Sequence, residues 1–125
     1  MNICQIFLLV SALCLIPVAL SYGLDPQRSL GYLFDVSVSN RNGIHIFRAI
    51  MGLYLALVVF WSIGACRVEV RQAALYSLVV FMLGLASGRV VSIVLDGMPD
   101  WLLVFYLGLE FSAGISGLLL LNKSD

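Results

Sequence analysis

The sequence has little charge, and its charges balance. Only 11% of the 125 residues are charged, seven basic against seven acidic, and Lys123 is the single lysine. A protein that binds nucleic acid needs a basic face to neutralise phosphates. This chain has none, so we exclude nucleic acid as a partner. With 62% hydrophobic residues, it also has too little polar surface to coat a water-soluble particle.

Familiar catalytic and metal-binding motifs are also missing. Cys4, Cys14 and Cys66 lack C-x-x-C spacing, which excludes the redox pair of a thiol oxidoreductase and gives no metal cluster. The single histidine, His45, has no acid or nucleophile at a recognisable spacing. No glycine-rich phosphate loop occurs. We therefore expect no metal and no cofactor, and the sequence favours a non-catalytic protein over an enzyme.

The sequence does contain four long apolar stretches. Each has about 20 residues, the length at which a helix rising about 1.5 Å per residue crosses about 30 Å of hydrocarbon. Lipid offers no partner for backbone groups, and the strict alternation of a membrane β-strand is absent, so these stretches are predicted to be helices. We place the spans of a single transmembrane domain, residues 1–125, at residues 3–22, 44–66, 73–95 and 101–121.

The first span competes with a secretory signal peptide, because it is N-terminal and ends in the small residues Ala19 and Ser21. However, no lysine or arginine precedes it, and its apolar run exceeds the roughly 7 to 15 residues of a cleaved signal. We therefore expect it to be retained as a span. Pro17 is expected to kink that helix.

Connection lengths predict how the spans are arranged. Residues 67–72 and 96–100 form short connections, which force antiparallel neighbours. The predicted fold class is therefore all-α, an integral membrane up-down four-helix bundle. The connection at residues 23–43 is longer, and apolar residues such as Leu30 and Phe34 make it unlike a free loop. It is predicted to form a short helix that lies in the membrane interface or caps the bundle.

Basic residues near the span ends indicate orientation. The side that carries both termini has Arg67, Arg71 and Lys123, whereas the other side has Arg28 and Arg41. Lysine and arginine are enriched on the cytoplasmic side of membrane proteins. This bias predicts that both termini lie in the cytoplasm.

Three ionisable residues lie inside the spans: Arg48, Arg89 and Glu110. A charge in hydrocarbon costs several kcal/mol unless it is paired or meets water, so these side chains are expected to face the bundle interior. Counted from the side of the long connection, they lie roughly one, two and two to three turns deep, in one half of the membrane. Beside Arg89, the small residues Gly84 and Gly88 would let helices approach closely. The prediction is a tight bundle that opens into a polar pocket.

Further polar and aromatic residues are assigned from their depth. Tyr54 and Tyr106 lie deep enough that their hydroxyls need partners, either on a neighbouring helix or in the charged cluster. His45 lies on the same helical stripe as the first intramembrane arginine. Trp61 and Trp101 lie near span ends, where an interfacial aromatic belt explains them.

Several segments resemble the bacterial domain of unknown function 4345 family. They are the run at residues 42–55, NGIHIFRAIMGLYL, then Gly88-Arg89, the loop at residues 96–99 and Glu110. The resemblance covers residues 33–121 and implies a small integral membrane protein with four helices and no assigned activity. We expect its location to be the bacterial inner membrane. The resemblance draws attention to Asn42, Arg48, Gly52, Tyr54, Arg89 and Glu110.

Several interpretations of the intramembrane charges stay open. Arg89 and Glu110 could form a purely structural ion pair. A small transporter acting as a dimer could use Glu110 to couple protons to a substrate, although small multidrug exporters, similar in size, carry their essential glutamate in the first span. An enzyme that acts on a lipid, with Glu110 or His45 as general base, is the least favoured alternative.

We adopt a binding or accessory protein, because two arginines against one glutamate leave a positive charge that an anionic lipid or metabolite would balance. Membrane lipids are the expected partners, together with a second copy of the chain or another membrane protein. The predicted ligand-binding residues are Arg48, Arg89, Glu110, Tyr54, Tyr106, His45 and Asn42.

Overall fold

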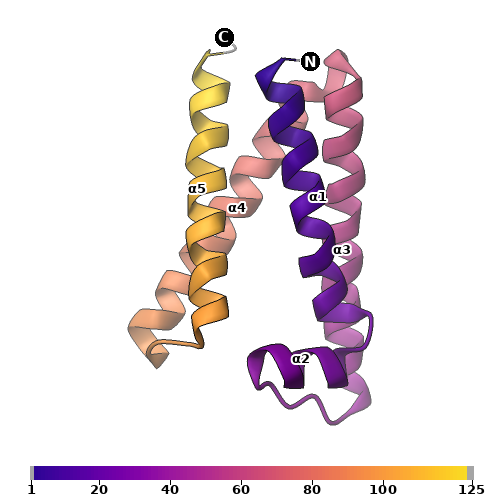
Figure 1. The fold of residues 1–125 in the computed structure, drawn as a ribbon, viewed down its shortest axis with the longest axis vertical. Coiled ribbons are helices and arrows are strands. Elements are labelled where there is room, and N and C mark those ends of the chain that lie inside the picture. The colour runs from indigo at the N-terminus through magenta and orange to yellow at the C-terminus, as the bar shows by residue number, and fades with distance from the viewer. Residues whose placement is uncertain (1, 124–125) are drawn as a thin grey trace.

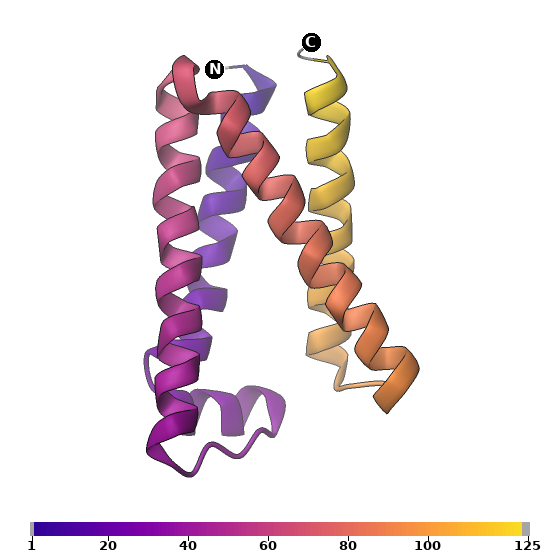
Figure 2. The same ribbon diagram turned by 180° about the vertical axis from the view of Figure 1, so that it is seen from behind.

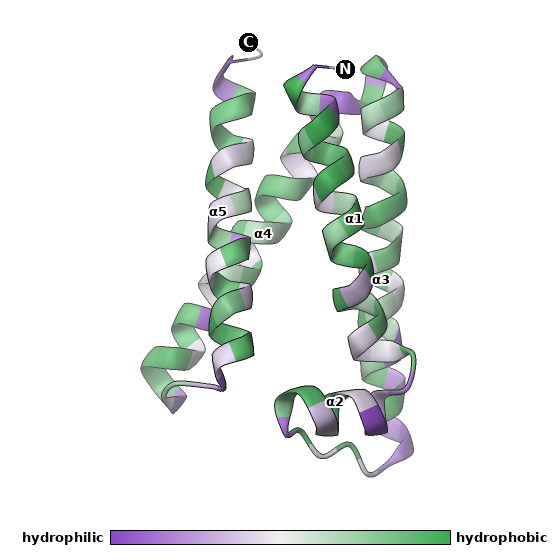
Figure 3. Ribbon diagram, viewed as in Figure 1, coloured by the Kyte–Doolittle hydropathy of each residue, from purple (hydrophilic) through white to green (hydrophobic). Residues whose placement is uncertain are grey.

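The fold is all-α (Figure 1). A computed structural model describes residues 2–123 and contains five helices: α1 (Ile3–Gly23), α2 (Pro26–Phe34), α3 (Arg41–Cys66), α4 (Val68–Asp96) and α5 (Trp101–Lys123). All except α2 are long and apolar enough to cross a membrane. Figure 3 shows apolar residues along most of their length, with polar residues gathered toward the helix ends. The short helix predicted between the first two spans is present as α2.

Local sequence signals set several helix ends. Asn2 and Gln5 form a capping box at the start of α1. The side chain of Asn40 accepts a hydrogen bond from the first turn of α3, so that helix begins before the predicted span. Pro26 opens α2, where the missing N–H is not needed. Asp35 ends α2 with a left-handed φ of 56°.

The predicted connection at residues 67–72 is mostly helical instead. Only Arg67 is extended, and α4 begins at the next residue. Arg71 donates from Nε to the carbonyl of Gly64 (3.0 Å) and from Nη2 to that of Ala65 (3.0 Å). Carbonyls at a helix C-terminus lack intrahelical partners. Arg71 therefore satisfies the end of α3 and holds the tight turn between α3 and α4.

The long helices run alternately down and up, so the described chain ends lie at the same end of the molecule (Figure 1). α1 packs along α3, α4 packs along α5, and α2 lies across one end, where it contacts α1, α3 and α5. Away from their shared turn, α3 and α4 diverge (Figure 2). α4 has 29 residues. At about 1.5 Å per residue it is roughly 43 Å long, more than the about 30 Å that a helix needs to cross the hydrocarbon of a membrane.

The core lies between α1, α3 and α4, around fully buried residues such as Leu8, Leu75 and Trp61. The Trp61 indole Nε1 donates a hydrogen bond to Ser77 Oγ at 3.0 Å. The prediction that Trp61 belongs to an interfacial belt is therefore wrong, because its helix face packs inward. Trp101, in contrast, is 77% exposed at the start of α5.

Close helix contacts occur at different glycines from those predicted. A Cβ added to Gly84 or Gly88 would meet nothing within 4 Å. A Cβ on Gly64 would collide with that of Ala74, and one on Gly114 would collide with a leucine side chain of α4. Close packing at Gly84 and Gly88 was wrongly predicted, because the divergence of α4 moves that face away from α3.

Candidate functional site

Arg89 of α4 and Glu110 of α5 form a bidentate ion pair in the interior. Arg89 donates from Nε to Oε1 (2.7 Å) and from Nη2 to Oε2 (3.1 Å) of Glu110. Their side chains are only 20% and 10% exposed, whereas the other ion pairs within residues 2–123 are mostly exposed. Two parallel charge-assisted hydrogen bonds offset much of the cost of burying both charges. The pair therefore links α4 to α5 inside the apolar region.

Tyrosines from the other helices complete this site. Arg89 Nη2 also donates to the Tyr22 hydroxyl of α1 at 3.4 Å. The Tyr54 ring of α3 meets the Tyr22 ring edge-on, with centroids 5.6 Å apart. The guanidinium of Arg89 lies 5.9 Å from the centre of the Tyr106 ring, within the range of a cation–π contact. Each of the four long helices thus contributes at least one side chain.

Phe34 of α2 packs against two of the tyrosines of the site. Its ring lies 5.9 Å from the ring of Tyr22 and 5.9 Å from that of Tyr106. Sequence reasoning missed both Phe34 and Tyr22. Tyr22 stands near the end of α1, whereas Arg89 is seven residues from the end of α4. The tilt of α4 reduces the depth of Arg89, so counting along straight helices did not pair these residues.

Arg48, His45 and Asn42 lie away from the ion pair. All three are exposed, and within residues 2–123 Arg48 forms no ion pair. The buried face of α3 includes Tyr54. Six residues separate Arg48 from Tyr54, about 600° of helix rotation, which leaves the two about 120° apart. The predicted stripe of His45 and Arg48 therefore faces outward, and the predicted cluster of two arginines and one glutamate does not form.

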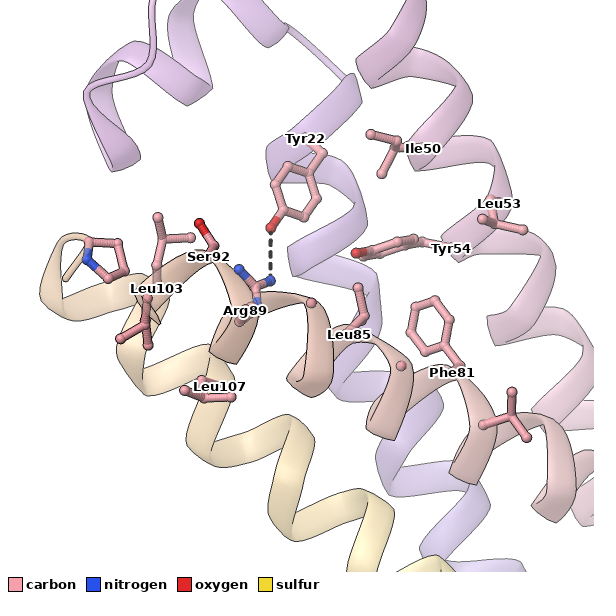
Figure 4. A pocket seen from close by; sticks show the side chains of 15 residues that line it. Tyr22, Ile50, Leu53, Tyr54, Phe81, Leu85, Arg89, Ser92, Leu103 and Leu107 are labelled. Carbon is pink, nitrogen blue, oxygen red and sulfur yellow. Dashed lines mark hydrogen bonds between the residues drawn. The ribbon is translucent and has the colours of Figure 1, made fainter. Parts of the chain in front are cut away.

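A groove opens where α3 and α4 diverge, and we call it the α3/α4 groove (Figure 4). It has a volume of about 710 Å³ and mainly apolar walls. Arg89, Tyr22, Tyr54 and Ser92 supply its polar side chains. Within residues 2–123, no hydrogen bond uses Nη1 of Arg89. Two N–H donors of a guanidinium that lines the groove are therefore available.

A second groove lies between α1 and α5, and we call it the α1/α5 groove. Its volume is about 300 Å³, and Glu110, Tyr106, Ser11, Ser112 and Ser116 line it together with apolar residues. No residue lines both grooves. The arginine of the ion pair thus reaches one groove and the glutamate reaches the other.

The chemistry of this site is charge and hydrogen bonding. Within residues 2–123, no group of three or more His, Cys, Asp or Glu side chains could hold a metal ion. The cysteines Cys4, Cys14 and Cys66 are unpaired. The geometry offers donors on one side of the ion pair and acceptors on the other.

Residues 3–121 match a family model described as Domain of unknown function (DUF4345). The match begins with the first residue of α1 and reaches the last turn of α5. No curated protein and no solved structure matches the chain. The function therefore has to be argued from the site itself.

Proposed function

The chain belongs to the DUF4345 family, and from that premise we propose that it is a non-catalytic membrane protein that binds an anionic lipid in the α3/α4 groove. The observation that carries this proposal is the position of Arg89. Glu110 occupies its Nε and Nη2 side, while Nη1 has no hydrogen-bond partner within residues 2–123 and belongs to a guanidinium that lines the groove. Guanidinium donors suit the oxygens of phosphate and carboxylate groups.

The walls of the groove favour a lipid over a water-soluble metabolite. Leu53, Phe81 and Leu103 are among the side chains that line it. An acyl chain can cover such a surface, whereas a small polar metabolite would leave most of the apolar wall without an apolar contact. On this proposal the head group accepts hydrogen bonds from Nη1, and the hydroxyls of Tyr22 and Tyr54 lie on the same side of the site.

The same proposal includes the membrane arrangement. We infer that α1, α3, α4 and α5 span a bacterial inner membrane with both termini in the cytoplasm, and that α2 lies at the opposite interface. The bias of Arg67, Arg71 and Lys123 supports this orientation. A bound lipid would fill the space where α3 and α4 diverge and so complete a four-helix bundle.

Native mass spectrometry after extraction from membranes that contain phosphatidylglycerol tests lipid binding. Arg89→Gln alone would leave Glu110 unpaired, so the informative variant is Arg89→Gln/Glu110→Gln, which removes both charges of the buried pair. Arg48→Gln is the matched control, because it removes an arginine from an exposed face. We expect the wild type and the control to retain phosphatidylglycerol, and the double variant to retain at least tenfold less.

Two outcomes would contradict this function. Equal retention by the double variant would show that Arg89 does not hold the head group. Equal loss in Arg48→Gln would show that retention depends on overall positive charge rather than on the groove. Circular dichroism of each variant establishes that the helices remain folded.

A further inference from the structure

Three serines in the α1/α5 groove differ from the other serines of the four long helices, whose hydroxyls donate hydrogen bonds to protein. Within residues 2–123, Ser11, Ser112 and Ser116 donate no hydrogen bond to protein. A serine in an apolar helix usually donates to a carbonyl of the preceding turn. The serines that do so here are Ser21, Ser62, Ser77 and Ser87, at 2.7 to 2.8 Å.

Among these serines, Ser11 gives the strongest evidence for a ligand. It is only 9% exposed, on the face of α1 that lines the groove. In the described part of the chain, every fully enclosed side-chain nitrogen or oxygen has a hydrogen-bond partner. Because the Ser11 hydroxyl has none, it is not fully enclosed and reaches the groove that Ser11 lines. A molecule other than the protein would be its partner there.

Glu110 adds hydrogen-bond acceptors to the same groove. Its carboxylate accepts one hydrogen bond from Arg89 at each oxygen. A carboxylate has about four lone-pair sites, so it can accept further hydrogen bonds without giving up the ion pair. Phe7, Leu15 and Val18 supply apolar wall beside these groups. The groove thus combines a small polar centre with a surface suited to a hydrocarbon chain.

Charge decides which head group fits. An ammonium group here would be repelled by the positive charge of Arg89, which already donates to both oxygens of Glu110. An anion would face the carboxylate of Glu110. An uncharged hydroxyl avoids both costs, since it can donate to Glu110 and accept from Ser11.

We propose that the α1/α5 groove is a second lipid site, which binds the hydroxyl head of an uncharged lipid such as a long-chain alcohol or an acylglycerol. The hydroxyl donates to Glu110 and accepts from Ser11. The chain lies along Phe7, Leu15 and Val18 and leaves through the open side of the groove into the bilayer. The residues that line this site differ from those of the anionic-lipid site, and the proposal does not rest on that site.

Photolabelling in phosphatidylcholine nanodiscs tests this site. The probes are a long-chain alcohol with a diazirine in the chain, its methyl ether, and the amine of the same length. We expect the alcohol to label peptides of the α1/α5 groove at least threefold more than the ether, which cannot donate, and more than the amine. Ser11→Leu should remove this excess by filling the groove. Ser87→Leu is the control, since Ser87 is exposed and lines neither groove.

Each alternative result has a definite meaning. Equal labelling by alcohol and ether would show only apolar partition and would overturn the proposal, as would stronger labelling by the amine. Equal loss of labelling in Ser11→Leu and Ser87→Leu would also overturn it. If Ser11→Leu does not fold, Ser116→Leu narrows the same groove from an exposed position. Retention of phosphatidylglycerol by these variants tests the α3/α4 groove independently.

Discussion

At the residue scale, Glu110 is buried with one hydrogen-bond partner among residues 2–123, Arg89. The Glu110 side chain is only 10% exposed, and both carboxylate oxygens accept from Arg89. Removing one member of a buried ion pair leaves an uncompensated charge, which costs about 3–5 kcal/mol. Replacing both members by neutral groups avoids that cost. The two kinds of variant should therefore behave differently.

We expect Arg89→Gln to lower the free energy of unfolding by about 3–5 kcal/mol at neutral pH, because it strands the Glu110 carboxylate. Arg89→Gln/Glu110→Gln should recover most of this loss. Arg48→Gln, on an exposed face, should change stability by no more than about 0.5 kcal/mol. Reversible unfolding in mixed micelles measures all three. A double variant as unstable as Arg89→Gln would show that the ion pair itself, and not the stranded charge, provides the stability.

The two tryptophans should report opposite environments. Trp61 is fully buried and hydrogen-bonded to Ser77, whereas Trp101 is 77% exposed. In liposomes, brominated lipids should quench the emission of the Trp61→Phe variant, in which Trp101 remains. They should leave the Trp101→Phe variant nearly unquenched. Strong quenching of Trp61 would mean that α1 and α4 do not cover it in the bilayer.

At the element scale, helix packing is set by glycines that have close neighbours. Gly64→Ala would press a new methyl group against Ala74, which has no flexible side chain to move away. We expect it to destabilise the protein by about 1–3 kcal/mol, as overpacking does. Gly84→Ala, with open space around it, should be neutral or stabilising by up to about 1 kcal/mol. Thermal unfolding in detergent compares them, and equal effects would contradict the packing of α3 against α4.

Helix positions could be predicted from the sequence, but helix faces could not. Length and apolar composition were enough for the four long helices, and the apolar residues around Leu30 were enough for α2. The spans, however, are apolar around most of their circumference, so no polar stripe distinguishes a lipid face from a protein face. The ionisable residues of the spans were taken to face inward, which is correct for Glu110 and wrong for Arg48.

The ends of the helices show a second limit. Arg71 was expected in a loop, where it would indicate orientation by its charge alone. It instead binds the carbonyls of Gly64 and Ala65 at the end of α3. Such a contact depends on the turn geometry that Arg67 adopts between the two helices. Sequence spacing does not specify that geometry, so the tight turn could not be predicted.

At the scale of the whole molecule, the tilt of α4 determines the site. It opens the α3/α4 groove and brings Arg89 to Tyr22, although the two residues lie at different distances from their helix ends. Tilt is set by packing against neighbouring helices and by the mismatch with bilayer thickness. A sequence gives helix length but not tilt. The pairing of Arg89 with Glu110 was therefore predictable as an alternative, whereas the two grooves were not.

The two grooves should be thermodynamically coupled, because one ion pair lies between them. An anionic head group at Arg89 competes for the guanidinium and leaves more of the Glu110 charge for a donor in the α1/α5 groove. Coupling of this kind is reciprocal and commonly changes affinity by roughly fivefold or more. We therefore expect phosphatidylglycerol nanodiscs to raise alcohol-probe labelling of the α1/α5 groove roughly fivefold over phosphatidylcholine nanodiscs. Glu110→Gln should abolish this increase, and Arg48→Gln should preserve it. Labelling that is independent of lipid charge, or an increase that survives in Glu110→Gln, would mean that the ion pair does not connect the two sites.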